Sequence, residues 1–162
     1  MKKKTLFIAG AVAVLASGVW AELFYFRFHT FFQRTEVQET LPPMPSGKTQ
    51  VQARTVVSGS FVAVDAVHKG SGTARIVEQG GIQYLRLENF EVTNGPDLYL
   101  YLSESTTPGG SLQSLGAYIN LGGLKGNAGN QTYAIPGSFR GHNTAVIWCQ
   151  KFGVLFSYAV MR

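Results

Sequence analysis

Short runs of alternating apolar and polar residues recur from about Arg54 to the end of the chain, with turn residues between them. About eight runs have this form, and Leu98–Leu102, where leucine alternates with tyrosine, is the clearest. A period of two is typical of half-buried β-strands, and no comparable run keeps the spacing of a long helix. Asn94-Gly95-Pro96 and similar clusters supply turns. The pattern predicts an all-β, antiparallel fold of about eight strands, a sandwich or a barrel.

The only cysteine, Cys149, ends one of these runs. Side chains alternate along a strand, so Ala145, Ile147 and Cys149 share one face and Val146 and Trp148 share the other. Both faces are apolar, which predicts a strand buried on both sides. Cys149 then has two interpretations, a small packed hydrophobe or a site of redox chemistry or ligation. A third is a disulfide bond to another chain, because one cysteine cannot form an internal disulfide.

The first 32 residues have the features of a membrane-directed segment. Three lysines follow Met1, and Thr5–Ala21 is uncharged and mostly apolar. A helix from Thr5 to Phe26 would be about 33 Å long, enough to cross a bilayer. We expect a retained single-pass anchor, with signal-peptide cleavage after Val19-Trp20-Ala21 as the alternative. The lysines keep the N-terminus cytoplasmic, so the C-terminal domain is extracytoplasmic in both cases.

Residues 33–53 are polar and rich in proline, which predicts an extended spacer between the anchor and a domain at 54–162. The formal charge of the whole chain is +5. From Gln33 onward, 10 Lys and Arg face 8 Asp and Glu, a net charge of +2. No cluster of basic residues follows the leader, so we expect no nucleic-acid partner.

Sequence motifs of the common hydrolases, zinc proteases, thioredoxins and phosphate-binding loops are missing from the chain. Two turns carry residues that could bind a ligand. Asp65 and His68 stand three apart before a glycine-rich turn, and Asp97 follows Asn94-Gly95-Pro96. Capping of the turns by the aspartates is the simple interpretation. Alternatively, Asp65 and Asp97 contribute oxygens to a cation site, or His68 is a ligand.

One ordered set of stretches runs through the predicted domain: His68–Ala74, Leu85–Val92, Asn94–Ser103, Leu124–Tyr133 and Val146–Cys149. Together these stretches resemble one family, the DM-thirteen domain, also called the electron-transfer domain of Skeletor-like proteins. The resemblance runs from about Val57 to Met161. It implies an extracytoplasmic β-sandwich related to the DOMON domains, with a redox role centred on Cys149.

Two functions follow as expectations. In the first, a membrane-tethered β-sandwich transfers electrons or exchanges thiols through Cys149 with a redox partner protein. A reactive thiolate would need a lowered pKa, for which Lys151 and His142 are the nearby cations in the sequence. A haem or a metal ion held by His68 and Cys149 is an open possibility, although no covalent haem motif is present.

In the second, the domain is a non-enzymatic binding or cell-surface organisation module for a carbohydrate, a cation or a protein. Cys149 is then a core residue, and the residues to probe are Asp65, Asp97, Tyr99 and Tyr101.

Overall fold

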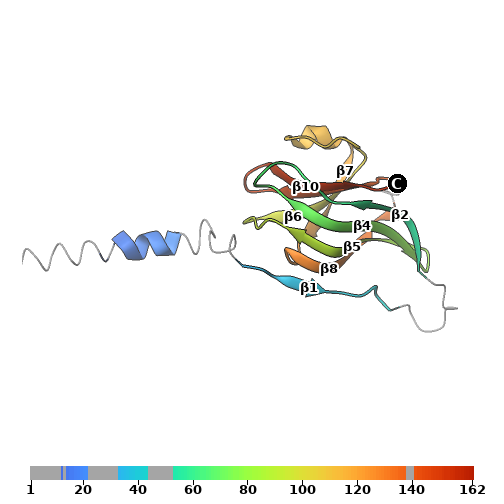
Figure 1. Cartoon of the computed structure of the whole chain (residues 1–162), viewed down its shortest axis with the longest axis horizontal. Coiled ribbons are helices and arrows are strands. Elements are labelled where there is room, and N and C mark those ends of the chain that lie inside the picture. Colours follow the sequence, from blue (N-terminus) through green and yellow to red (C-terminus); the bar gives the residue numbers. More distant parts are fainter. Residues whose placement is uncertain (1–11, 13, 22–32, 44–52, 138–140) are drawn as a thin grey trace, which may run out of the picture.

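The structure is a computed structural model that describes residues 12, 14–21, 33–43, 53–137 and 141–162 (Figure 1). Residues 12 and 14–21 are helical. In this described part, no helix has both the length and the apolar character needed to span a membrane. Most of the predicted span from Thr5 to Phe26 lies outside the described residues.

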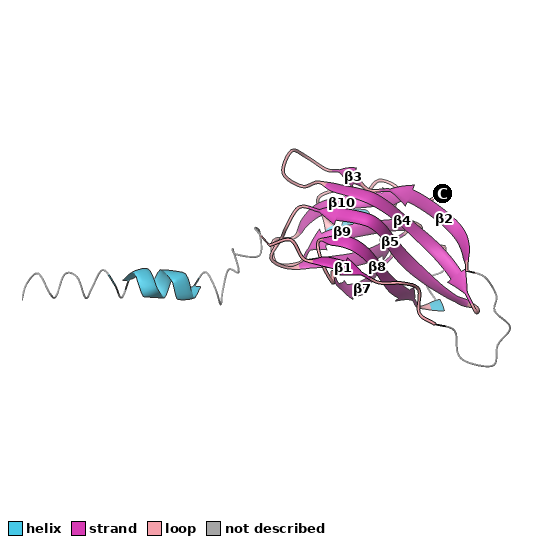
Figure 2. Cartoon of the chain, turned by 60° about the horizontal axis from the view of Figure 1, so that its bottom comes forward, coloured by secondary structure: helices cyan, strands magenta, loops and turns pink. Residues whose placement is uncertain are grey.

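Two five-stranded sheets pack face to face as a β-sandwich (Figures 1 and 2). Sheet A has the order β1-β8-β5-β4-β2, and sheet B has the order β3-β10-β9-β6-β7. A short 3-10 helix, η3, precedes β7. The elements are β1 Glu36–Gln38, β2 Arg54–Ser60, β3 Val62–Ala63, β4 Gly70–Gln79, β5 Ile82–Val92, β6 Leu98–Ser103, η3 Leu112–Leu115, β7 Tyr118–Gly123, β8 Ala128–Ile135, β9 Thr144–Cys149 and β10 Val154–Val160.

The predicted all-β sandwich is confirmed, but the predicted number of eight strands is wrong, since the described residues form ten. The additional strands are β1 and β2, which lie at the two edges of sheet A. Their side chains are mostly exposed. An edge strand is held by backbone hydrogen bonds to one neighbour and needs no buried face, so it leaves a weak alternation in the sequence.

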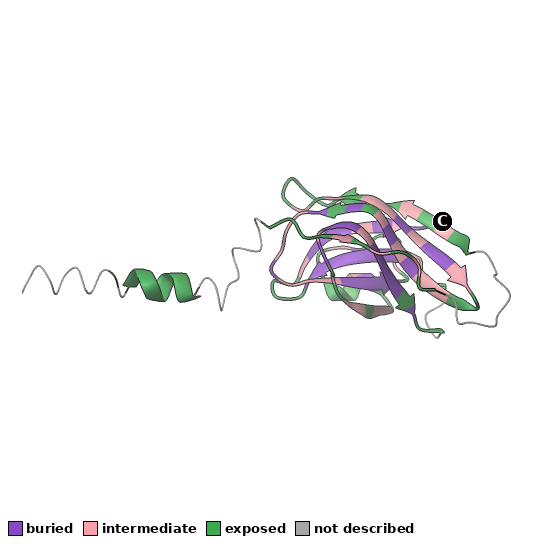
Figure 3. Ribbon diagram, turned by 90° about the horizontal axis from the view of Figure 1, so that it is seen from below, coloured by how far each residue is buried: buried purple, intermediate pink, exposed green. Residues whose placement is uncertain are grey.

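The main core lies between the sheets and includes Ala74, Leu85, Leu100 and Ile147. A smaller cluster on the outer face of sheet B is centred on Trp148 and closed by Leu115 from η3. Strand β9 lies between β10 and β6, and all six of its residues are buried (Figure 3). The predicted burial of this strand on both faces is therefore confirmed.

Part of the predicted spacer belongs to the sandwich. β1 pairs in parallel with β8, from Glu36 opposite Ala128 to Gln38 opposite Asn130. Glycines make room for this approach. A Cβ atom on Gly129, whose φ is +97°, would overlap the carbonyl oxygen of Val37, and one on Gly126 would overlap that of Thr35.

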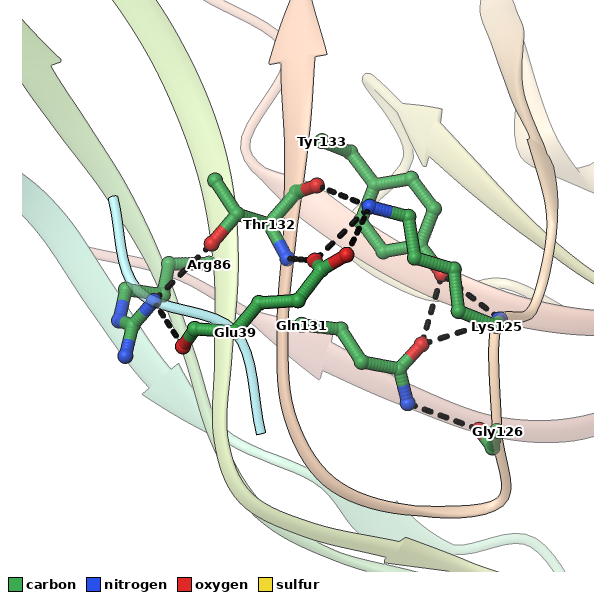
Figure 4. A network of polar contacts seen from close by, with 7 residues as sticks. All are labelled: Glu39, Arg86, Lys125, Gly126, Gln131, Thr132 and Tyr133. Atoms are coloured by element: carbon green, nitrogen blue, oxygen red, sulfur yellow. Dashed lines mark hydrogen bonds and ion pairs between the residues drawn. The ribbon is translucent and has the colours of Figure 1, made fainter. Parts of the chain in front are cut away.

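Charged and polar side chains fix the end of β1 against β8 (Figure 4). Lys125 Nζ donates to both carboxylate oxygens of Glu39, at 2.9 and 2.8 Å, and to the carbonyl of Thr132 at 2.8 Å. The Thr132 amide donates to Glu39 at 2.9 Å, and Arg86 donates to the Glu39 carbonyl at 3.1 Å. Burial raises the pKa of Glu39, but these bonds and the charges of Lys125 and Arg86 outweigh burial and lower it.

Candidate functional site

Loops that carry most of the predicted site residues meet at one end of the sandwich, which we call the loop end. Antiparallel pairing brings the end of β9 beside the starts of β6 and β10, with Cys149 opposite Leu98 and Val154. Parallel pairing places the start of β1 beside the start of β8. The loop end consists of residues 33–35, 64–69, 93–97, 124–127 and 150–153.

Two asparagines join the segments of the loop end. Asn94 Nδ2 donates to the carbonyl of Gln33 at 2.8 Å. Asn127 Nδ2 donates to Asn94 Oδ1, and Asn127 Oδ1 accepts from the Thr35 amide at 2.6 Å. The sequence 126–130 had the composition of a turn alone, yet it also begins β8 and holds the segment before β1. Only tertiary pairing reveals that role.

Cys149 faces the main core and is 0% exposed. Burial raises the pKa of its thiol, and the negative charge of Asp97 adds to the increase. Hydrogen bonds from the backbone amides of Phe152, Asp97 and Lys151 favour the thiolate but do not offset burial. The side chain is therefore a neutral thiol, sealed by the loops that precede β6 and β10.

The expected activation of Cys149 by a nearby cation is wrong for this structure. His142 precedes the start of β9 whereas Cys149 ends it, a separation of about 20 Å along the strand at about 3.3 Å per residue. Lys151 reaches the sulfur with its backbone amide, while the residue itself is exposed. The pKa of the thiol is raised rather than lowered, because burial disfavours the charged form.

Asp65 caps a turn as predicted, but the turn is that of residues 65–68, because Gly70 to Gly72 begin strand β4. Its Oδ1 accepts from the amides of Val67 and His68, both at 2.7 Å, and its Oδ2 lies 2.7 Å from His68 Nδ1. The hydrogen bond with the His68 side chain, followed by the two amide bonds, lowers the pKa of Asp65 to about 2. The imidazole ring packs edge-on against Phe156, with 4.6 Å between ring centroids.

Asp97 lines a cleft of about 320 Å³ at the loop end. Polar side chains dominate its wall, and Tyr99 adds an aromatic ring. Asp65 lines a different hollow, beside Gly153 and Val154. The residues of the cleft that matter here are Gln33, Thr35, Asn94, Asp97, Tyr99, Lys125 and Asn127.

No group of three or more His, Cys, Asp or Glu residues in the described part of the chain is placed to hold an ion. The closest pair is Asp65 with His68, where the carboxylate engages Nδ1 as it does behind metal-binding histidines. The Asp65–Asp97 cation site and the His68–Cys149 ligand pair stay predictions, and no step is derived through a metal or a haem.

Fold and site together define a class of protein, a two-sheet β-sandwich whose single cysteine is buried beneath the loops at one end. The family described as Electron transfer DM13 matches residues 60–161. The chain belongs to this family, which confirms the resemblance drawn from its motifs. The match begins at the last residue of β2, so β1 lies outside it. No curated protein and no solved structure matches the chain.

Proposed function

We propose that the protein is a membrane-tethered, extracytoplasmic electron-transfer module whose redox role depends on Cys149. The observation that carries this proposal is the electron-transfer family match over the sandwich. Two further features support it. Cys149 is the sole cysteine, and it lies at the loop end, where several of the resembling stretches converge.

The burial of Cys149 favours electron transfer over thiol–disulfide exchange. Thiol–disulfide exchange requires a thiolate that attacks a sulfur atom directly. A neutral thiol that is 0% exposed meets neither condition. Electron transfer requires no bond between the partner and the sulfur, so the proposal is electron transfer without exchange.

In the proposed redox cycle, the Asp97 carboxylate accepts and returns the proton of the Cys149 thiol. An oxidised one-electron partner protein takes one electron from the Cys149 thiol, and the thiol proton passes to Asp97, which leaves a sulfur radical and a carboxylic acid. A reduced partner then returns the electron, and Asp97 returns the proton. The Asp97 carbonyl accepts from the Gln150 amide at 3.0 Å, next to Cys149 in the chain, and this proximity supports the choice of Asp97 as the base.

The test is stopped-flow reaction of the purified protein with hexachloroiridate(IV), a one-electron oxidant, followed by spin trapping. We expect a sulfur-centred radical that is lost in Cys149→Ala and forms more slowly in Asp97→Asn. Ile147→Val is the matched control, since it alters the same buried face of β9 and keeps the sulfur. Identical oxidant uptake and radical yield in Cys149→Ala would overturn the Cys149-centred role.

A second candidate function rests on the polar cleft. Its asparagines, Asp97 and Tyr99 are residue types that bind polyhydroxylated ligands or a cation. Here the sandwich is a binding or surface-organisation module and Cys149 packs in the core. Calorimetric titration with calcium chloride and with soluble oligosaccharides tests it, with Tyr99→Phe and Asp97→Asn as variants. No heat with either probe would contradict this second function for those ligand classes.

The membrane tether is supported by the sequence of residues 1–32, with its lysines and apolar stretch. Carbonate extraction of membranes that contain the full chain tests it. The proposal expects the protein in the pellet with an intact N-terminus by mass spectrometry. A soluble chain that begins after Ala21 would support secretion after signal cleavage instead.

A further inference from the structure

The chain enters the sandwich at the loop end. Because β1 runs parallel to β8, the residues before it lie beside the start of β8, and the Gln33 carbonyl accepts from Asn94. Six residues, 27–32, lie between Phe26, the end of the predicted span, and Gln33. Even fully extended, the seven steps from Phe26 to Gln33 cover about 25 Å at 3.3–3.6 Å per residue. The docking of β1 thus keeps the loop end near the point where the chain would leave a membrane.

Exposed apolar side chains gather on the loops of this end. Val64 and Val67 are 40% and 65% exposed on the loop after β3, and Phe152 is 52% exposed on the β9–β10 hairpin. The two loops line one hollow through Val64 and Gly153. Figure 3 shows exposed residues on these loops. Apolar side chains at loop tips are suited to insertion among lipid headgroups.

The charges of the loop end favour the same contact. Exposed Lys69 and Lys151 stand next to the apolar tips in the sequence. The acidic groups have partners, Asp65 with His68 and Glu91 with Arg34 at 2.8 Å. Asp97 is only partly exposed, in the wall of the cleft. Lysines that flank apolar tips suit a surface of anionic lipids.

We propose that the loop end lies against the bilayer surface, with Val67 and Phe152 among the headgroups and the cleft open toward the membrane. This inference rests on the proposed tether. It also shortens the predicted spacer of residues 33–53, because β1 is part of the sandwich. The electron partner must then reach the site along the membrane rather than from the bulk solution.

Depth-dependent tryptophan quenching tests the orientation. The full chain, with Trp20→Phe to silence the leader, is reconstituted in phosphatidylcholine–phosphatidylglycerol vesicles with brominated acyl chains. Phe152→Trp and Val67→Trp report on the loop end. The matched control is Ile82→Trp, because Ile82 is 49% exposed at the start of β5, at the opposite end of the sandwich. Emission of buried Trp148 in each variant confirms that the sandwich is folded.

We expect several-fold stronger quenching and a blue-shifted emission for Phe152→Trp and Val67→Trp than for Ile82→Trp. If the chain floats with the vesicles but all three variants are quenched equally, the orientation is wrong and the tether stands. If the chain does not float with the vesicles, the tether fails and the orientation fails with it.

Discussion

Strand β1 is held against β8, and Cys149 is shielded from water, by different kinds of interaction. At the edge, β1 is held by three residues of backbone pairing, glycine contacts and the polar network of Lys125 and Glu39. Around Cys149, the packed sheets, together with the loops that precede β6 and β10, exclude water. The edge can therefore open while the core stays intact, whereas exposure of the sulfur requires disruption of the sandwich.

Of the substitutions considered, Gly129→Ala should weaken the pairing of β1 with β8 most. The new Cβ would occupy the position of the Val37 carbonyl at a φ of +97°. We expect a loss of about 3 kcal/mol, from backbone strain of about 1–3 kcal/mol and the clash. Urea unfolding measures the loss, and limited proteolysis detects release of β1. Gly153→Ala is the control, because its Cβ meets nothing within 4 Å, and it should cost about 1 kcal/mol. Equal losses would contradict the role of close approach.

Alkaline pH weakens the edge through Tyr133. Burial, together with the charge of Glu39, raises the pKa of Tyr133 from 10.0 to about 12. A raised folded-state pKa gives stability that is complete below pH 10 and lost as the pH rises through about 12. Because the pKa of Tyr133 differs between the folded and unfolded states, the free energy of unfolding should fall by on the order of 2 kcal/mol over this pH range. Urea unfolding between pH 9 and 12, at about one-unit steps, measures it. Tyr133→Phe should flatten the profile, and an unchanged slope would refute the assignment.

Cys149→Ser probes the second region. A hydroxyl replaces a thiol in the apolar core, and we expect a loss of about 1–3 kcal/mol. The native thiol should react with a small alkylating agent only at the rate of global unfolding, because no opening reaches it. Alkylation kinetics in increasing urea measure this. Labelling that is fast in the native state, or that follows the release of β1, would contradict the claim that Cys149 is exposed only when the sandwich unfolds.

Glu39→Gln gives the smallest effect. The carboxylate is partly exposed, so loss of the pair with Lys125 should cost about 1 kcal/mol or less. The pKa of Glu39 is lowered, so its contribution is present above pH 4.5 and disappears as the pH falls. Urea unfolding at neutral and acidic pH checks this, with Glu36→Gln in the preceding strand β1 as control. A loss in the control equal to that in Glu39→Gln would show that the Lys125 pair adds no stability.

The strands that line the core were predictable because side chains alternate between the two faces of a strand, so the residue types on each face show whether that face is buried. Ala145–Cys149 shows this, since its apolar residues on both faces predicted a strand buried on both sides. The capping of a turn by Asp65 was also predictable, because its partners are two and three residues away. Local spacing suffices for such contacts.

Other features depend on residues that are far apart in the sequence. β1 forms a strand because Gly126 and Gly129, some 90 residues later in the chain, leave room for it. No local sequence pattern predicts this pairing. The raised pKa of Cys149 likewise comes from its burial in the folded core, and His142, near it in the sequence, lies at the other end of β9. The sequence alone determined the sandwich, the family and the lone thiol. Tertiary packing decided which edge is covered and how closed the sulfur is, since both depend on distances that only the folded chain sets.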